Sequence, residues 1–385
     1  MFDNKNLKPG WRICRFDQMA TNVNARIDNP SESGMEHYIG LEHLDADSLK
    51  IRRWGTPDDV EATKLMFKKG DIIFGRRRAY QRKLGVAAFD GICSAHAMVL
   101  RANPDVVLPE FLPFFMQSDL FMKRAVEISV GSLSPTINWK TMAAQEFAVP
   151  PVDEQTSMVR TLLGFEECLE STELLSAAAE KLRRSLMVGN FEEVHSENRK
   201  VSEIGRWHSG GTPSRGNSAF WGGPIPWVSP KDMKVSELDS AEESLTAEGV
   251  EAGSKLMPQD TIMIVVRGMI LAHTFPVART LVRASFNQDM KALVVSDEYR
   301  PKYIQYWFEY AAPRYLRLVS ESSHGTKRLE SDKLFSLAVP KPDLDEQDDF
   351  IAQLDGARAS VDKSRERHAE MLRMKRIFLD QSLAS

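Results

Sequence analysis

The sequence predicts an α+β protein in which two similar mixed α/β globules are joined by two long helices forming an antiparallel coiled coil. Three observations predict this fold class. At 385 residues, the chain is too long for one ordinary domain. Its two halves resemble each other at an offset near 190 residues. Each half ends in a stretch whose apolar residues step alternately by four and three, which is typical of a helix packed against another helix.

The duplication is clearest where each globule ends. There, "FAVPPVDEQ" at 147–155 matches "LAVPKPDLDEQ" at 337–347. Three further pairs match in the same order: "YIGLEHLD" with "WVSPKDMK", "KGDIIF" with "PQDTIM", and "PEFLPFFMQ" with "PKYIQYWFE". A period this long indicates a duplicated domain and not a solenoid repeat. We therefore expect a first globule at 1–151, a central spacer helix at 152–189, a second globule at 190–342 and a C-terminal spacer helix at 343–385.

Each globule is expected to combine short strands with one helix. Runs such as "DIIFG", "AHAMVL", "TIMIVV" and "KALVV" have the length and the β-branched content of strands. The helices are predicted at 109–128 and 301–319. A Val-Pro pair is expected to stop the last strand or loop of each globule. The Asp-Glu pair that follows is favourable at the N-terminus of the next helix.

The two spacer helices carry matching stripes. The first runs from Met158 to Leu186, and the second repeats it 192 residues later, from Phe350 to Phe378. Two unrelated surface helices would not share this register, so the pattern favours an intramolecular pair about 50 Å long. The residues expected in the seam are Leu162, Phe165, Leu169, Leu186, Phe350, Leu354, Val361, Met371 and Phe378.

Polar residues interrupt both stripes near the middle, at Thr172, Ser176, Ser364 and His368. Two interpretations stay open: wet contacts between the helices, or room left for partner subunits. In the second interpretation, acidic outer positions would meet a basic face of the partner. These positions are Glu166, Glu167, Glu170 and Glu173.

The composition is that of an ordinary soluble protein, with 42% hydrophobic and 27% charged residues. No apolar run approaches the length of a membrane span, and the N-terminus lacks the order of a signal peptide. Three separated cysteines without a Cys-x-x-Cys pair argue against a disulfide framework or a zinc site and fit the cytoplasm. The net charge of −4 originates in the spacer helices, where 152–189 and 343–385 carry 11 basic and 17 acidic residues.

The loop "GGTPSRGNSAFWGG" at 210–223 superficially resembles a nucleotide-triphosphate loop. From Gly211 it runs Gly-x-x-x-x-Gly-x-Ser, but Asn217 stands where a lysine would reach the phosphates. The stretch before it is too short and polar for a central parallel strand, and the glycines and prolines after it exclude a helix. We interpret it as a surface loop rich in turn-forming residues.

A concentrated run of positive charge, "FGRRRAYQRKLG" at 74–85, follows the strand-like "DIIF". It is expected to form a hairpin turn or strand end. Arginine and lysine neutralise phosphates, and arginine also binds guanine edges. A solvated charged face is the usual interpretation of such a run, but the globule around this one is nearly neutral. The candidate DNA contacts are Arg76, Arg77, Arg78, Tyr80, Arg82 and Lys83.

Two similar globules on a rigid helix pair would form a pseudo-symmetric caliper. B-DNA presents equivalent groove faces about every 34 Å. A caliper of this size suits two short half-sites separated by a fixed, unread gap.

The stretch "SGGTPSRGNSAFWGGPIPWVSPKDM", the two "VPxxDEQ"-like junctions and the duplication resemble the specificity subunit of type I restriction–modification systems. The resemblance implies a non-catalytic subunit whose two target-recognition domains read a bipartite, asymmetric site on double-stranded DNA. It implies docking of two methyltransferase subunits, which use S-adenosylmethionine, and assembly with two motor-nuclease (restriction/translocase) subunits, which use ATP and Mg. No cofactor is expected on this chain. The first globule lacks a counterpart of the Gly-Gly-Thr-Pro loop, as expected if it reads a different half-site.

The resemblance gives the loops of the second globule a role. Hydroxyl, guanidinium and amide groups on a glycine-rich backbone suit contacts with phosphates or base edges. A purely structural turn is the alternative. The candidate DNA contacts in this globule are Thr212, Ser214, Arg215, Asn217, Lys231, Lys327 and Arg328. Weaker candidates are Ser132, Ser134, Asn138, Arg267, His273, Asn287 and Gln288, while His96 is expected in the core.

Two alternative functions have less support in the sequence. A DNA methyltransferase or nuclease acting alone lacks support, because the chain has no Asp-Pro-Pro-Tyr-type motif, glycine-rich cofactor turn or Walker lysine. A structural adaptor with a helical rod predicts no salt-dependent DNA affinity, and it leaves the basic run at 74–85 unexplained.

Overall fold

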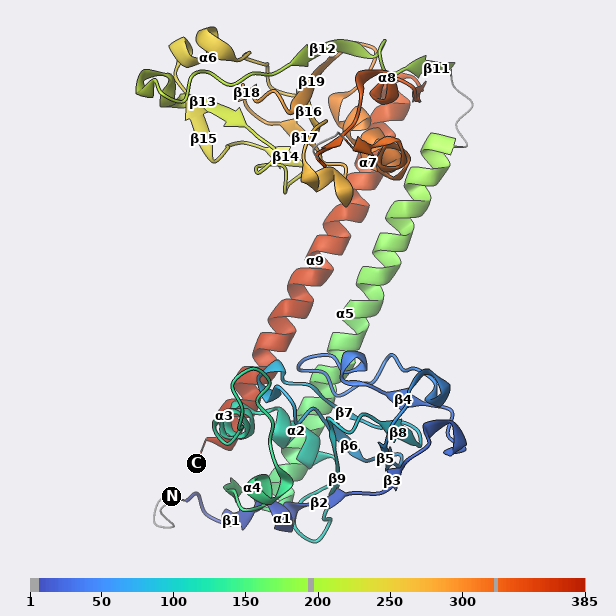
Figure 1. The fold of residues 1–385 in the computed structure, drawn as a ribbon, viewed down its shortest axis with the longest axis vertical. Coiled ribbons are helices and arrows are strands. Elements are labelled where there is room, and N and C mark those ends of the chain that lie inside the picture. The colour runs from blue at the N-terminus through green and yellow to red at the C-terminus, as the bar shows by residue number, and fades with distance from the viewer. Residues whose placement is uncertain (1–6, 193–196, 322–324, 385) are drawn as a thin grey trace. The chain divides into compact units, whose positions relative to one another are not determined.

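The computed structural model describes residues 7–192, 197–321 and 325–384 (Figure 1). The chain divides into two compact units. Unit 1 contains Met1–Glu173 and Arg365–Ser385, and unit 2 contains Leu174–Ser364. Each unit therefore holds one globule with parts of both long helices. In the described ranges, we find no helix with the length and apolar character needed to span a bilayer.

The globule of unit 1 is built on two four-stranded sheets (Figure 1). The first has the order β2-β9-β6-β7, with β2 at Ala20–Val23, β9 at Met98–Ala102, β6 at Ile72–Phe74 and β7 at Leu84–Val86. The second has the order β3-β5-β8-β4, with β3 at Arg26–Ile27, β5 at Lys64–Phe67, β8 at Gly91–Cys93 and β4 at Tyr38–Ile39. A separate pair, β1 (Arg12–Arg15) and β10 (Glu146–Val149), closes the globule.

The globule of unit 2 repeats this plan with a larger sheet. Its order is β12-β19-β16-β17-β14, with β12 at Gly205–Ser209, β19 at Met290–Val295, β16 at Ile262–Val265, β17 at Val277–Thr280 and β14 at Glu237–Leu238. A three-stranded sheet joins β15 (Glu243–Leu245), β13 (Trp221–Val228) and β18 (Ser285–Phe286), and α6 (Ala247–Gly253) contacts it. The pair β11 (Glu197–Lys200) and β22 (Ala338–Lys341) corresponds to β1 and β10.

The predicted strands are confirmed: "DIIFG", "AHAMVL", "TIMIVV" and "KALVV" contain β6, β9, β16 and β19. Two expectations were wrong in detail. The Val-Pro pair ends β10, but Pro340 lies inside β22, where it pairs with Asn198 in a two-stranded sheet. Proline is tolerated there because such a sheet consists only of edges.

The single helix predicted at 109–128 is in fact two helices, α2 (Phe111–Gln117) and α3 (Asp119–Glu127). Ser118 between them has extended backbone angles, and its side chain accepts a hydrogen bond from Phe121 N as an N-cap. The second copy keeps one continuous helix, α7 (Pro301–Leu318). The break leaves the Gln117 carbonyl free to accept a hydrogen bond from Arg82.

The repeated Glu-Gln junction has the same structural role in both units. Gln155 is buried, accepts a hydrogen bond from Leu108 N and donates one to the Pro150 carbonyl. Gln347 makes the equivalent bonds with Arg300 N and the Pro342 carbonyl. Each glutamine therefore fastens the start of a long helix to the segment that begins the globule's own helix. This explains why the motif occurs twice.

The two long helices are α5 (Val152–Glu192) and α9 (Leu344–Leu383), which pack antiparallel (Figure 1). Every position of the two predicted stripes is buried or half-buried, as a seam between two packed helices requires. In unit 1 the rings of Phe165 and Phe378 lie 6.0 Å apart. In unit 2, Phe350 packs against Phe191 from α5, with ring centroids 5.0 Å apart. The polar middle contains a hydrogen bond between Thr172 Oγ1 and His368 Nδ1, 2.9 Å long.

Lys375 is the most buried lysine of the seam, with 5% of its surface exposed. Its Nζ forms an ion pair with Glu166 and donates to Gln117 Oε1 at 2.8 Å. Glu166 is therefore not the outer, partner-facing residue that the sequence suggested. Removing one member of a buried pair leaves the other charge desolvated and unpaired.

We expect Lys375→Met to lower the melting temperature of the chain by on the order of 5–10 °C, because a cost of about 3 kcal/mol is typical for breaking a buried pair. The double variant Lys375→Met/Glu166→Met should recover most of this loss, since no charge then stays buried. Differential scanning calorimetry on the two variants measures both values. A double variant less stable than the single one would contradict this account.

Candidate DNA interface

The basic run forms the loop of a β-hairpin, as the sequence predicted. Strands β6 and β7 pair antiparallel from Phe74 opposite Leu84 to Ile72 opposite Val86, and residues 75–83 connect them. A short 3₁₀ turn occupies Ala79–Gln81. Arg78 on one side of this turn has φ 58° and ψ 54°, a left-handed conformation that is uncommon for a non-glycine residue and often marks functional loops.

The basic loop contacts a second loop, which comes much later in the sequence of the same globule. The backbones of Arg77 and Thr136 form an isolated antiparallel β-bridge, and Arg78 N donates to the Pro135 carbonyl. The Arg78 guanidinium donates to Ser134 Oγ at 3.1 Å. Ser134 was a weaker candidate from the sequence. The tip of this second loop is open to solvent, since Leu133 is 90% exposed. Two segments separated by about fifty residues of sequence thus form one surface.

His96 also belongs to this surface. The sequence placed it in the core, and this was wrong, because His96 is exposed and its Nε2 lies 3.4 Å from Arg77 Nη1. The preceding arginine in the loop, Arg76, donates to the carbonyl of Ala95, which is adjacent to His96. Partial burial lowers the pKa of His96, and the positive charges of Arg77 and Arg76 lower it further. The lone histidine carried no pattern that could have placed it here.

The six residues of the basic run divide into two groups. Arg82 forms ion pairs with Asp47 and with Asp119, the latter at 2.9 Å, and Lys83 donates to the Leu41 carbonyl. These two side chains are half-buried and serve the fold. The other four remain candidate contacts: Arg76, Arg77, Arg78 and Tyr80, the last with 54% of its surface exposed.

Arg76, Arg77 and Arg78 lack a carboxylate partner within the described part of the chain, since their side chains contact a backbone carbonyl, a histidine ring and a serine hydroxyl. Three adjacent guanidinium groups without counter-charges produce an uncompensated positive field. Such a field attracts the phosphate backbone of DNA.

Unit 2 brings the equivalent loops together. The backbone of Arg267, which follows β16, forms an isolated β-bridge with that of Arg328, just as Arg77 does with Thr136. The loop before β19 lies beside them, because Arg267 pairs with Asp289 at 3.8 Å and Gln288 accepts a hydrogen bond from Thr212. The predicted residues Thr212, Lys327 and Arg328 and the weaker candidates Arg267, Asn287 and Gln288 therefore share one region.

Charge distinguishes this region from its counterpart in unit 1. Lys327 pairs with Glu321, and Arg328 pairs with Glu330 at 3.0 Å. The basic groups of the second surface are thus largely compensated. Contacts here would depend on hydroxyl and amide groups more than on net positive charge.

The Gly-Gly-Thr-Pro loop is followed by a 3₁₀ turn at Ser218–Phe220 and by β13, so the predicted absence of a helix is confirmed. The strand before it, β12, is an antiparallel edge strand. Gly211 is needed for close packing, because a Cβ there would lie 2.2 Å from the Gly253 carbonyl oxygen. Asn217 caps the 3₁₀ turn by accepting from Ala219 N. Both residues act in the fold of the loop.

Arg215 is stacked on tryptophan. Its guanidinium lies 4.0 Å from the centroid of the Trp221 ring and 5.0 Å from that of Trp227, and it forms a two-pronged ion pair with Glu243. The Trp221 indole donates to the Ser214 carbonyl. Lys231 is exposed and adds to the positive charge near Glu243. The hydrogen bond from Arg215 lowers the pKa of Glu243, so this carboxylate is ionised at neutral pH.

If Arg215 contacts DNA, Glu243 competes with the phosphates for it. We then expect Glu243→Gln to raise affinity for double-stranded DNA on the order of threefold, since one opposing charge is removed. Glu248→Gln, on exposed α6 nearby, is the matched control for the same change in net charge. If a fluorescence-anisotropy titration shows that both variants change the DNA affinity equally, Arg215 does not contact DNA and only stabilises the loop.

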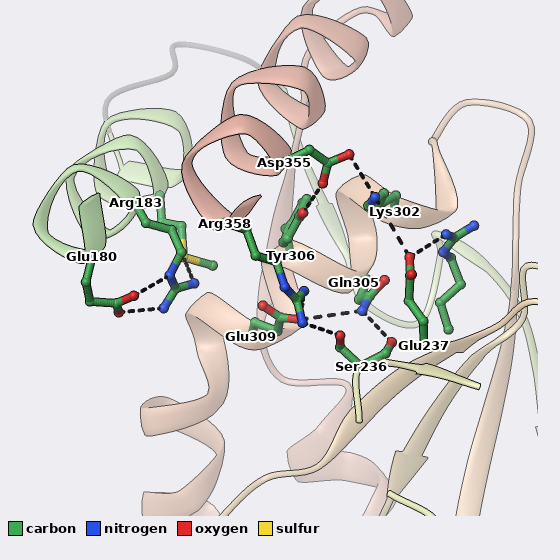
Figure 2. Close-up of polar contacts among 12 residues, drawn as sticks. Glu180, Arg183, Ser236, Glu237, Lys302, Gln305, Tyr306, Glu309, Asp355 and Arg358 are labelled. Atoms are coloured by element: carbon green, nitrogen blue, oxygen red, sulfur yellow. Dashed lines mark hydrogen bonds and ion pairs between the residues drawn. The ribbon is translucent and has the colours of Figure 1, made fainter. Parts of the chain in front are cut away.

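The long helix α9 is fixed to the globule of unit 2 by a polar network (Figure 2). Asp355 accepts hydrogen bonds from Lys302 Nζ at 2.8 Å and from the Tyr306 hydroxyl. Arg358 donates to Ser236 Oγ and lies 3.9 Å from Glu309. Burial raises the pKa of Glu309. The network leaves α9 little freedom to shift against α7.

The outer acidic positions of α5 contact the globule of unit 1. Glu170 pairs with Lys50, and Glu173 pairs with Arg52 at 2.9 Å. They are thus engaged within the chain, which weakens the hypothesis that they await a basic partner face. Glu167 stays exposed.

Residues 32–181 match the family model of the type I restriction modification DNA specificity domain. The chain is 39% identical over 168 residues to the EcoR124I/EcoR124II specificity subunit of Escherichia coli, which covers 43% of this chain and 42% of that protein. It is 29% identical over 154 residues to the MjaIX specificity subunit of Methanocaldococcus jannaschii, covering 39% and 34%. The matches thus span less than half the length of these relatives.

Solved structures match the chain over its whole length. A chain from a type I R-M system, solved to explain complex assembly and conformational transition, has a TM-score of 0.64 at 20% identity and covers 98% of both chains. The S subunit of a type I restriction–modification system from M. genitalium has a TM-score of 0.58 at 14% identity, covering 100% of this chain and 98% of the other. At these identities the likeness establishes the fold.

Proposed function

Because the chain belongs to the family of type I restriction–modification specificity subunits, we propose that it is the non-catalytic subunit that reads DNA for such a system. Each unit recognises one half of a bipartite, asymmetric site. The helices α5 and α9 set the unread gap between the half-sites and dock two methyltransferase subunits.

The observation that carries this proposal is the surface of unit 1 made by Arg76, Arg77, Arg78 and Ser134. It combines uncompensated positive charge with hydroxyl and guanidinium donors at the tips of two loops. Phosphate contacts position a protein on DNA, and arginine forks onto guanine O6 and N7 provide base recognition. The matching bridge between Arg267 and Arg328 supports a second surface of the same origin in unit 2.

The cofactors belong to the partners in this proposal. S-adenosylmethionine binds the methyltransferase, and ATP and Mg bind the motor-nuclease subunits where a system includes them. This chain recognises the DNA sequence, and the methyl transfer and cleavage occur on other subunits.

The test is co-expression with the methyltransferase encoded beside this chain, followed by genome-wide mapping of methylated adenines. A single bipartite motif with a constant gap, present only when this chain is co-expressed, is the expected result. An active methyltransferase that methylates no such motif in the presence of this chain would overturn the proposal and favour an adaptor.

A further inference from the structure

One exposed position is equivalent in the two globules and carries a different polar side chain in each. In unit 1, β9 begins at Met98 and pairs with β6, and in unit 2, β19 begins at Met290 and pairs with β16. His96 and Gln288 lie two positions before these methionines. They are 192 residues apart, which is the offset of the duplication, and both are exposed. The fold therefore presents a histidine in one copy and a glutamine in the other at the same place.

Both residues lie next to the isolated β-bridge that connects two loops in each globule. His96 contacts Arg77, whose backbone forms this bridge in unit 1. Gln288 directly precedes Asp289, and the Asp289 carbonyl accepts a hydrogen bond from Arg267 N. Arg267 forms the bridge in unit 2. The shared position therefore belongs to the candidate DNA surface in both units.

A neighbouring guanidinium determines which atom His96 offers to a ligand. Arg77 Nη1 lies 3.4 Å from His96 Nε2, and a guanidinium can only donate, so Nε2 is the acceptor. The ring proton is then on Nδ1, which makes no hydrogen bond with any residue that the structure describes. Partial burial and the charges of Arg77 and Arg76 lower the pKa of His96, which agrees with a neutral ring. The side chain therefore offers one N–H donor.

Gln288 is oriented in a similar way by the Gly-Gly-Thr-Pro loop. The Thr212 hydroxyl donates to Gln288 Oε1, so the side-chain NH₂ group is left to donate. The preceding residue, Asn287, is occupied within the fold, because it is buried and both ends of its amide bond to Asp289. Of these two neighbouring amides, Gln288 is the one that offers free donors.

The groups left to contact a base at this position are thus N–H donors in both units. The carboxylate beside Gln288, that of Asp289, is engaged by Arg267 at 3.8 Å and by Asn287. In the major groove, guanine presents two acceptors, N7 and O6, and no donor. Adenine and cytosine each present an amino donor there, and thymine presents a methyl group. Guanine is therefore the base that matches a position with donors only.

We propose that His96 and Gln288 determine specificity, each donating a hydrogen bond to N7 of a guanine in the half-site that its own unit reads. In unit 1, guanine O6 then faces the guanidinium of Arg77, and in unit 2 it accepts from the second N–H of the Gln288 amide. This inference rests on the proposed function and adds to it the base and the residues that read it. The duplicated globule keeps one reading position and changes the side chain that occupies it.

The proposal is tested on the complex of this chain with its methyltransferase. Mapping of methylated adenines first gives the two half-sites, and each of them should contain a guanine. DNA duplexes are then made in which each guanine in turn is replaced by 7-deazaguanine, which has a C–H group in place of the N7 acceptor. For the wild-type complex, one such replacement in each half-site should weaken binding about tenfold.

Variants of the two residues then identify which of them makes each contact. His96→Ala should weaken binding to unmodified DNA about tenfold, and the critical 7-deazaguanine of its half-site should then cost nothing further. Gln288→Ala should behave in the same way with the other half-site. Each variant keeps its full sensitivity to the half-site of the other unit, which serves as an internal control. Gln259→Ala is the matched control in unit 2, because Gln259 is exposed and lies at the opposite end of β16 from Arg267.

Three results would overturn the base contacts: a half-site without guanine, unchanged binding in His96→Ala or Gln288→Ala, or a full additional cost of every 7-deazaguanine in these variants. All three leave the proposed function standing, because a bipartite motif has then been mapped. If an active methyltransferase methylates no bipartite motif in the presence of this chain, the proposed function itself fails, and the base contacts fail with it.

Discussion

Replacing Arg77 and Arg78 together by alanine is expected to weaken binding of the methyltransferase complex to its DNA site about 30-fold, or about 2 kcal/mol. The two guanidinium groups lie on one surface with Ser134 and have no acidic partner among the described residues. If both neutralise phosphates, the slope of log K against log salt should also become shallower, by about 0.9 for each lost contact. Titrations at several salt concentrations measure the affinity and the slope together.

Arg160→Ala is the matched control for that experiment. Arg160 is an exposed arginine on α5, in the same unit but outside the proposed surface. It should change neither quantity. The opposite pattern would also be informative: an unchanged slope with a large loss for one half-site sequence only would mean that the pair reads bases instead of phosphates. Unchanged affinity and slope would remove the arginines from the interface.

Periodicity was sufficient to predict the helical part of the fold. The stripes of α5 and α9 are buried at the predicted positions because helix burial follows a local period that the sequence displays directly. The strands around β6 and β16 were equally visible as short β-branched runs. The break at Ser118 was not visible, since a serine is compatible both with a helix interior and with an N-cap.

The candidate site was predictable in composition but not in arrangement. The basic run at 74–85 was evident, yet only the fold shows that Arg82 meets Asp47 and Asp119, acids 35 and 37 residues away in sequence. The same applies to Glu166, whose partner Lys375 lies 209 residues away. Pairings of this kind depend on tertiary contacts, so a run of charge does not reveal which of its members are already neutralised.

Deleting one heptad from each long helix, residues 169–175 and 361–367, is expected to shorten the unread gap while leaving both half-sites intact. A heptad contributes about 10 Å of helix, which corresponds to at most about three base pairs of DNA at about 3.4 Å each. Seven residues preserve the spacing of four and three, so the apolar stripe stays in register on both sides of the deletions. Mapping methylated adenines in cells that carry the deletion variant measures the gap directly.

The matched control for the deletion keeps the helix length constant. Leu174 and Leu175 are exposed on α5 within the deleted stretch, so Leu174→Ala/Leu175→Ala alters the same surface without removing a residue. This variant should methylate the original motif with the original gap. An altered half-site in the deletion variant would mean that the long helices take part in base recognition. An unchanged gap would mean that they do not set the spacing, because the gap would then depend on how the two recognition surfaces bend the DNA between them.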